Sequence, residues 1–219
     1  VIARYILTPR ITIPRLIAED PRGNYRDFSI ASSPNERREL KIAICNSESG
    51  FKRSLLESPL GAEVRATGPF GNLALPESAE APVVFVAGGI GITPFFSMIN
   101  YVLERKSGQR MTLIFGNKSQ ESTPYFKELE VLTQTNSTFS LKNILGPIDE
   151  ECIKSNIPDL TAAVWFIAGP PAMVVAVKKI LTNAGVPSEF IHTEEFLGYE
   201  AGESLYGLST IGAPGEKLD

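Results

Sequence analysis

The sequence predicts a two-domain protein in which a small antiparallel β-barrel is followed by an α/β domain with an open, mostly parallel sheet. Strand-like and helix-like segments alternate over residues 82–196, which is typical of a parallel sheet with helices on both faces. The first third instead contains short β-type segments separated by turn residues, and 43% of the 219 residues are hydrophobic, enough for such cores. We therefore expect a barrel over residues 1–78, an α/β domain over residues 79–199 and a mobile tail over residues 200–219.

The expected barrel consists of four short β-type segments and one helix. The β-type segments cover residues 11–17, 26–31, 40–45 and 63–68. Only residues 51–57 have a helical pattern in this part of the chain. A proline-bounded stretch over residues 76–82 is the natural linker to the second domain.

Two uncharged runs, residues 81–103 and 160–177, are long enough to raise the question of a membrane span. Glycine and proline interrupt both runs near the middle, which a continuous lipid-facing helix does not tolerate well. Each run is better explained as a buried strand, a tight turn and a helix, because strands covered on both faces are apolar throughout. We therefore expect no membrane insertion.

Each uncharged run supplies one strand and one helix of the α/β domain. The strands are expected at residues 83–87 and 164–168, and the helices at residues 94–105 and from Pro170 or Pro171 to Asn183. Thr93 can cap the first helix and Gly185 can end the second. Further strands at residues 111–115, 139–145 and 189–193, with helices near residues 122–132 and 149–155, complete the pattern.

Composition excludes several classes of function. The net charge is −4 and the pI about 5.3, so no overall positive field is available to bind nucleic acid. Two distant cysteines and one histidine disfavour iron–sulfur, zinc and Ser-His or Cys-His chemistry, so no metal is expected. Cys45 and Cys152 are expected to be small buried hydrophobes, and His192 a strand residue at the end of the sheet. The N-terminal residues lack a secretory pattern, which makes the cytoplasm the expected compartment.

Two glycine- and proline-rich turns are candidates for binding phosphate. The turn over residues 88–94 follows a strand and opens a helix, where glycines allow close backbone approach and the helix N-terminus offers free N–H groups. Its spacing differs from G-x-G-x-x-G, and a simple tight corner is the alternative. The turn over residues 168–173 would lie at the same edge of the sheet. Together the two turns favour a ligand cleft.

The first domain carries a second candidate phosphate region. Arg26 and Phe28 would share one face of a strand, which suits a ligand with phosphates and a flat ring, although ordinary surface packing is the alternative. Residues 49–54 offer a helix N-terminus with two cations, for which a solvated charged turn is the alternative.

The order of these motifs is more specific than any one of them. It runs from Arg26-x-Phe28-Ser29 through the helix start at Gly50, residues 68–71, the two turns, and residues 194–199. In this collinear order, over residues 23–199, the chain resembles the ferredoxin-NADP+ reductase family. The resemblance implies a flavin-binding barrel followed by a nicotinamide-dinucleotide domain, with FAD and NADP or NAD as cofactors that meet at the interface.

The resemblance also assigns residues to the flavin. Arg26 would pair with the pyrophosphate, Phe28 would pack on the flavin ring, and Ser29 would hydrogen-bond near flavin N5. The remaining flavin-binding candidates are Ile44, Gly50, Phe51, Lys52, Arg53 and Ser54.

A second set is assigned to the nucleotide and to catalysis. The dinucleotide would be held by Gly88, Gly89, Ile90, Gly91, Thr93 and Pro94, and its nicotinamide end would be lined by Gly169, Pro170, Pro171 and Met173. Asn117 and Lys118 would lie near the adenosine ribose, where Lys118 mildly favours NADPH over NADH. Glu194 would be the proton-handling carboxylate, Phe196 would shield the flavin, and Tyr199 is the other aromatic candidate.

Two departures from the family pattern shape the functional hypotheses. The P-G-Q-type segment is not found before Arg26, so we expect a shortened barrel, and Ala168 stands where many members have cysteine. The first hypothesis is an FAD-dependent NAD(P)H oxidoreductase that passes electrons to a redox partner such as ferredoxin, flavodoxin or an oxygenase or haem component. The alternative is a non-catalytic dinucleotide-binding module that has lost flavin.

Overall fold

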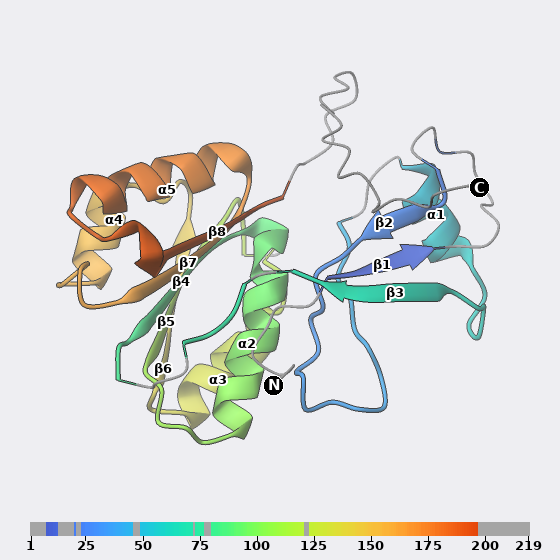
Figure 1. Cartoon of the computed structure of the whole chain (residues 1–219), viewed down its shortest axis with the longest axis horizontal. Coiled ribbons are helices and arrows are strands. Elements are labelled where there is room, and N and C mark those ends of the chain that lie inside the picture. The colour runs from blue at the N-terminus through green and yellow to red at the C-terminus, as the bar shows by residue number, and fades with distance from the viewer. Residues whose placement is uncertain are drawn as a thin grey trace, which may run out of the picture.

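The computed structural model describes residues 8–12, 20, 23–45, 49–71, 73–76, 80–120 and 123–196. It contains a five-stranded parallel sheet covered by helices and a three-stranded antiparallel sheet beside it (Figure 1). The tail over residues 200–219 and the candidate Tyr199 lie outside the described residues.

The parallel sheet has the strand order β6-β5-β4-β7-β8. Its strands are β4 (Val83–Gly88), β5 (Met111–Asn117), β6 (Phe139–Leu145), β7 (Val164–Gly169) and β8 (Ile191–Glu195). Every residue of β4 and β7 is buried, as expected for strands that are covered on both faces. The chain leaves β4 first toward β5 and later returns to its other side as β7, so the strand order reverses between the carboxyl ends of β4 and β7. Ligands of open α/β sheets bind at such a point.

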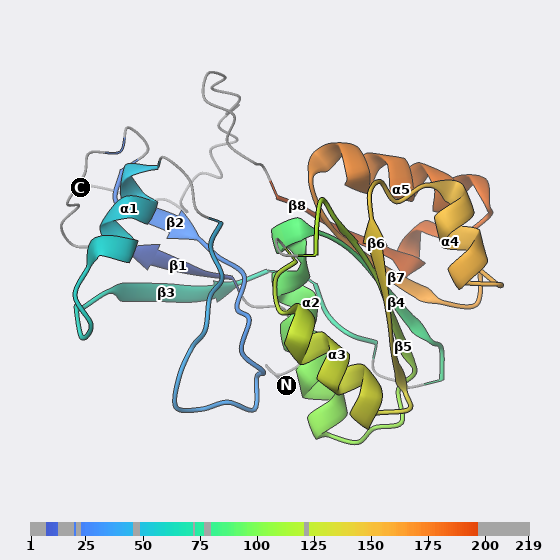
Figure 2. The ribbon, with the colours of Figure 1, turned by 180° about the vertical axis from the view of Figure 1, so that it is seen from behind.

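Helices cover both faces of this sheet, as the alternating sequence pattern predicts (Figures 1 and 2). The helices are α2 (Ile92–Glu104), α3 (Phe126–Thr135), α4 (Glu150–Asn156) and α5 (Pro171–Asn183). On one face, α2 and α3 enclose a core in which Phe85 contacts the rings of Phe95 and Phe166. On the other face, α4 and α5 pack around the fully buried Trp165.

Both uncharged runs are divided into strand and helix as predicted. Two predicted boundaries in the α/β part of the chain need correction. A 3-10 turn, η2 (Gly89–Gly91), precedes α2, so Gly91 rather than Thr93 is the N-cap and the helix begins at Ile92. The Thr93 hydroxyl lies inside the first turn and donates to the carbonyl oxygen of Ile90 at 2.8 Å. Near the end of the chain, a second 3-10 turn, η3 (Ser188–Phe190), delays β8 to Ile191. Within the described ranges no helix is both long and apolar enough to span a membrane.

The antiparallel sheet has the order β2-β1-β3, formed by β1 (Thr8–Thr12), β2 (Tyr25–Asp27) and β3 (Arg65–Phe70). Helix α1 (Gly50–Glu57) confirms the helix predicted here. The expected barrel is largely not seen in the described part of the chain. Residues 40–45 form no strand and contribute one isolated bridge, between Ile30 and Ile42, while residues 13–17 lie outside the described residues.

The segment from Ala31 to Lys41 explains this difference, because it joins α2 instead of extending the small sheet. The Ser97 hydroxyl donates to the carbonyl oxygen of Ser32 at 2.7 Å. Farther along α2, the Glu104 carboxylate accepts hydrogen bonds from the Ser33 hydroxyl at 2.5 Å and the Asn35 amide at 2.7 Å. We call these three hydrogen bonds the α2 latch. They attach the segment that follows Ser29 to helix α2, which packs on the parallel sheet.

Candidate cofactor-binding site

The two glycine turns pack against each other at the carboxyl edge of the parallel sheet. A Cβ atom added at Gly91 would lie 2.3 Å from the carbonyl oxygen of Ala168, and one added at Gly169 would lie 3.0 Å from the backbone nitrogen of Gly88. Gly169 also has a φ of +153°, which other residues rarely adopt. Backbone contact at this distance leaves no room for side chains. The prediction that both turns lie at one edge is therefore confirmed.

The first corner has a packed side and an open side. A Cβ atom at Gly88 would lie 2.7 Å from Sδ of Met173 and 2.9 Å from Cδ of Pro170, so the second turn closes this side. At Gly89, where φ is +51°, a Cβ atom would meet nothing within 4 Å. A positive-φ glycine with open space, just before the N-terminus of α2, suits close backbone approach by a phosphate. The corner thus fits a dinucleotide.

The other residues predicted for the nucleotide lie around this corner. Thr93 and Pro94 are buried in the first turn of α2, Ile90 is half-buried, and Pro170 is exposed just before Pro171 begins α5. Asn117 and Lys118 follow at the carboxyl end of β5. The buried Asn117 amide donates to Oδ1 of Asn143 at 3.4 Å, while Lys118 is exposed.

Ser29 and Glu194, both predicted to be catalytic, come together from the two parts of the chain. The carboxyl group of Glu194 lies beside the Ser29 side chain. Burial raises the pKa of Glu194, and the neighbouring Ser29 side chain offsets part of that shift. In the β7–β8 ladder Glu194 pairs with Ala168, which contacts the Gly91 corner. The chain after β2 therefore reaches the glycine corner.

Two further residues of this edge have clear structural positions. The backbone N–H of Phe196 donates to the carbonyl oxygen of Gly169 at 2.8 Å, and its half-buried ring packs against the core beside α2. His192 stacks on Phe166 with ring centroids 4.7 Å apart, and burial lowers the pKa of its imidazole. His192 is thus a strand residue of the edge strand β8, as predicted.

Arg26 and Phe28 lie together with Phe51 of α1. The Arg26 guanidinium is 5.1 Å from the centre of the Phe51 ring, and the Phe28 and Phe51 rings are 6.0 Å apart. Nη2 of Arg26 pairs with Oδ1 of Asp20 at 2.5 Å, while Nη1 donates to the carbonyl oxygens of Gly23 and Tyr25. The ring that Arg26 contacts is therefore that of Phe51 rather than Phe28, which packs on the other ring.

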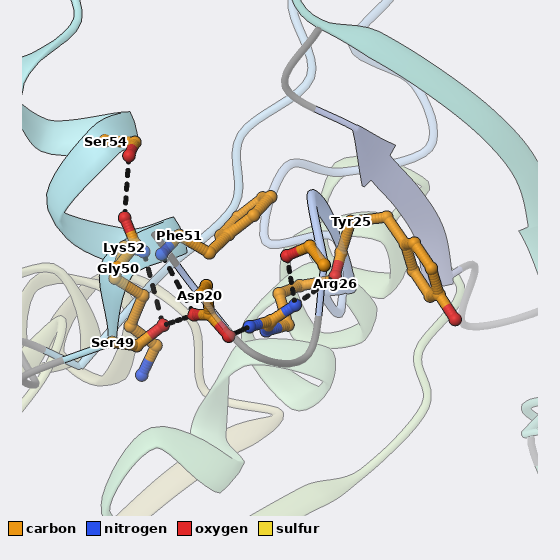
Figure 3. A network of polar contacts seen from close by, with 9 residues as sticks. Asp20, Tyr25, Arg26, Ser49, Gly50, Phe51, Lys52 and Ser54 are labelled. Atoms are coloured by element: carbon orange, nitrogen blue, oxygen red, sulfur yellow. Dashed lines mark hydrogen bonds and ion pairs between the residues drawn. The ribbon is translucent and has the colours of Figure 1, made fainter. Parts of the chain in front are cut away.

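Asp20 also caps the start of α1 (Figure 3). Its Oδ2 atom accepts hydrogen bonds from the Ser49 hydroxyl at 2.8 Å and from the backbone N–H of Phe51 at 3.0 Å. These donors, with Arg26, hold an anion, so the chemistry of the donor set fits a phosphate group as well. Asp20 was not among the sequence candidates, because nothing near it in sequence marks a carboxylate that reaches both Arg26 and α1.

The remaining flavin candidates differ in their surroundings. The buried Ser54 hydroxyl donates to the carbonyl oxygen of Gly50 at 2.7 Å, and the Lys52 backbone N–H donates to the Ser49 hydroxyl. Arg53 is exposed and pairs with Glu57 at 3.9 Å, and Ile44 is half-buried. Their contacts with a flavin stay predictions.

The described residues contain no cluster of histidine, cysteine and carboxylate side chains that could hold a metal ion. Cys45 is exposed, so the expectation that it is a buried hydrophobe is wrong. The reason is that residues 40–45 form no strand that would cover it. Cys152 is half-buried on α4, and burial raises the pKa of its thiol.

Taken together, the fold and the paired corners define an open α/β domain with a candidate ligand site at the carboxyl edge of its sheet, beside a smaller antiparallel sheet. Residues 85–179 match the family model for the oxidoreductase NAD-binding domain. Among sequence relatives, the chain is 28% identical to ferredoxin--NADP reductase B of Sorangium cellulosum, covering 78% of each protein. It is 25% identical to the reductase component of propane 2-monooxygenase from Rhodococcus jostii, covering 78% of this chain and 51% of that protein.

Solved structures show the same fold. A cytochrome P450 reductase from Amycolatopsis superposes with a TM-score of 0.71 at 20% identity, covering 89% of this chain and 60% of that one. The flavohem-like FAD/NAD-binding domain of a nitric oxide dioxygenase from Vibrio cholerae gives 0.71 at 18% identity, covering 90% and 89%. The chain is thus similar to the ferredoxin-NADP reductase-like FAD/NAD-binding oxidoreductases in sequence and in fold. It spans about half the length of the monooxygenase reductase and of a flavohemoprotein from Oceanobacillus iheyensis, 51% and 52%.

Proposed function

We propose that the chain is an FAD-dependent NAD(P)H oxidoreductase that passes electrons from the nucleotide through the flavin to a redox partner. The observation that carries this proposal is that the Ser29 side chain lies beside the Glu194 carboxyl group. This contact joins the segment assigned to the flavin to the strand that pairs with the Gly169 corner, assigned to the nicotinamide. Two ligands held by these segments would have their reactive ends at one place.

When bound, the nicotinamide supplies a hydride that the flavin accepts. The residues of this chain bind and orient. Gly88, Gly89 and the start of α2 position the dinucleotide, and Arg26 with the start of α1 positions the flavin pyrophosphate. Holding two reactants in a fixed geometry removes much of the entropic barrier, so few acid–base groups are needed.

Among the described residues, Glu194 beside Ser29 is the acid–base candidate at this place. Because burial favours the neutral carboxyl group, Glu194 can hold a proton where a fully exposed glutamate would have lost it. The Ser29 hydroxyl lies against that carboxyl and orients it. Phe196, whose backbone is fixed to Gly169, would cover the flavin ring from the end of β8.

We propose only the kind of electron acceptor and the kind of nucleotide. Oxygenase reductase components and ferredoxin reductases among the relatives support a redox protein as acceptor, such as ferredoxin, flavodoxin or an oxygenase or haem component. Lys118, exposed at the end of β5, favours NADPH, because its ammonium group can meet a 2′-phosphate.

The test is an anaerobic titration of the FAD-reconstituted protein with NADH and with NADPH, followed by flavin absorbance. We expect the absorbance to bleach with at least one nucleotide and to recover when an acceptor is added. Nucleotide binding without flavin binding would instead support the alternative, a non-catalytic dinucleotide-binding module that has lost flavin.

A further inference from the structure

Asp20 is held by two segments that also define the phosphate position of the proposed flavin site. Only 1% of its side chain is exposed, against 12% for Arg26. Figure 3 shows its carboxylate between the Arg26 guanidinium and the first turn of α1. One oxygen meets Arg26 at 2.5 Å, and the other accepts from the Ser49 hydroxyl and the Phe51 N–H. Both carboxylate oxygens are therefore engaged by cationic or N–H and O–H donors.

Local structure fixes Asp20 in this position. The N–H of Gly23 donates to the carbonyl oxygen of Asp20 at 2.9 Å, closing a turn, and Gly23 has a φ of +76°. The carbonyl oxygen of Gly23 in turn accepts from Nη1 of Arg26 at 3.2 Å. The turn, Arg26 and α1 thus form one connected unit centred on the carboxylate.

A phosphate group of a flavin nucleotide would need the same donors. The proposed function assigns Arg26 and the start of α1 to the flavin pyrophosphate, and the structure shows those donors holding Asp20. Two anions cannot share one buried set of donors, because like charges repel strongly where water is excluded. A phosphate can therefore bind here only if the Asp20 carboxylate leaves.

We propose that Asp20 is an internal competitor for the phosphate groups of flavin nucleotides. This inference rests on the proposed function and makes the flavin an exchangeable ligand. The phosphate groups of FAD and FMN therefore add little binding affinity over that of riboflavin, because the new phosphate contacts are offset by the loss of an ion pair and two hydrogen bonds to Asp20.

The test compares the wild-type chain with Asp20→Asn and Asp20→Ser, and with Glu63→Gln as a matched control. Glu63 is an exposed carboxylate between α1 and β3, so its substitution removes one negative charge without touching the Asp20 contacts. Dissociation constants for FAD, FMN and riboflavin are measured by flavin fluorescence at one ionic strength.

We expect both Asp20 variants to bind FAD and FMN at least about tenfold more tightly than the wild type, because charge-assisted donors become available to the phosphate. Riboflavin affinity should stay the same in all proteins, and the control should behave as the wild type. An unchanged or weaker affinity for FAD in both variants would overturn the proposal.

A measurement without flavin separates this proposal from the proposed function. Inorganic pyrophosphate should raise the thermal unfolding temperature of Asp20→Ser by more than that of the wild type. Equal rises would refute the competition even if flavins bind, whereas a larger rise without any flavin binding would refute only the oxidoreductase. If neither variant folds, wild-type affinities decide, since about hundredfold tighter binding of FAD than of riboflavin excludes an internal competitor.

Discussion

The carboxyl group of Glu194, on the edge strand of the parallel sheet, lies beside the side chain of Ser29, which belongs to the segment that follows β2. Ser29 is 5% exposed, so the contact is shielded from water. Two consequences follow: the interface between the two parts of the chain contains an acid with a raised pKa, and the geometry of that interface can be tested through this pair.

The Glu194→Gln variant should change how stability depends on pH. Burial raises the pKa of Glu194 above its ordinary 4.5, so the folded chain binds the proton more strongly than the unfolded chain does. The Glu194 contribution to the free energy of unfolding therefore falls as pH rises from about 4.5 through the raised pKa. The variant has no ionisable group at this position and lacks this loss. Its free energy of unfolding should therefore rise relative to that of the wild type as the pH rises through this range.

Urea denaturation at a series of pH values between about 4 and 8 measures the effect. Glu195→Gln is the control, since Glu195 is the next residue and is exposed. A difference between Glu194→Gln and the wild type that stays constant with pH would contradict the burial of an ionisable Glu194.

Gly91→Ala should destabilise the glycine corner more than Gly89→Ala does. At Gly91 the added Cβ would lie 2.3 Å from a backbone carbonyl oxygen, so the turns must separate, and we expect a loss of several kcal/mol, on the order of 3 or more. At Gly89 the space is open and only the positive φ is strained, which costs about 1–2 kcal/mol.

Chemical denaturation gives the two stability losses, and nucleotide titration gives the binding losses. Gly89→Ala should fold and bind nucleotide more weakly, because its methyl group projects into the space assigned to the phosphates. Should Gly89→Ala bind NADH and NADPH as tightly as the wild type, the dinucleotide does not approach this corner.

Removal of the α2 latch should slow flavin reduction without weakening cofactor binding. Ser97→Ala and Glu104→Ala each remove hydrogen bonds between the two parts of the chain, worth about 1 kcal/mol per bond. The latch lies on α2, away from the glycine corner, so nucleotide affinity should persist while the two rings lose their fixed geometry.

Stopped-flow measurement of flavin reduction, together with separate affinities for FAD and nucleotide, distinguishes these effects. Glu151→Gln, an exposed residue of α4, serves as the control. The positioning role fails if the double variant Ser97→Ala/Glu104→Ala reduces flavin at the wild-type rate.

Lys118→Gln should reduce the preference for NADPH over NADH. Lys118 is exposed at the carboxyl end of β5, where its charge can reach a 2′-phosphate that NADH lacks. Loss of one such contact should weaken the binding of NADPH by about tenfold and leave the affinity for NADH unchanged. Equilibrium titrations with both nucleotides test this, with Lys127→Gln on α3 as a matched exposed lysine. Equal weakening of both nucleotides would remove Lys118 from the specificity site.

The α/β domain could be predicted from the sequence because burial on both faces leaves a direct signature. All positions of β4 and β7 are buried, so each reads as an unbroken apolar run, and glycine and proline mark where each run turns into a helix. The glycine corners are also local features, since they depend on glycines next to a helix start. The antiparallel part was less predictable, because its strands are short and residues 40–45, which have a β-type pattern, form only an isolated bridge.

By itself, the sequence determined which segments become buried strands, where they turn, and that both glycine turns share one edge, because these properties depend on the residues of each segment. Only the tertiary structure decided that Ser29 lies beside Glu194 and that Asp20 lies between Arg26 and α1. It also decided that the Glu104 carboxylate accepts hydrogen bonds from Ser33 and Asn35. The physical reason is that such contacts join polar side chains distant in sequence. Their partners are chosen by how the two sheets pack, which no local pattern of charge or hydrophobicity encodes.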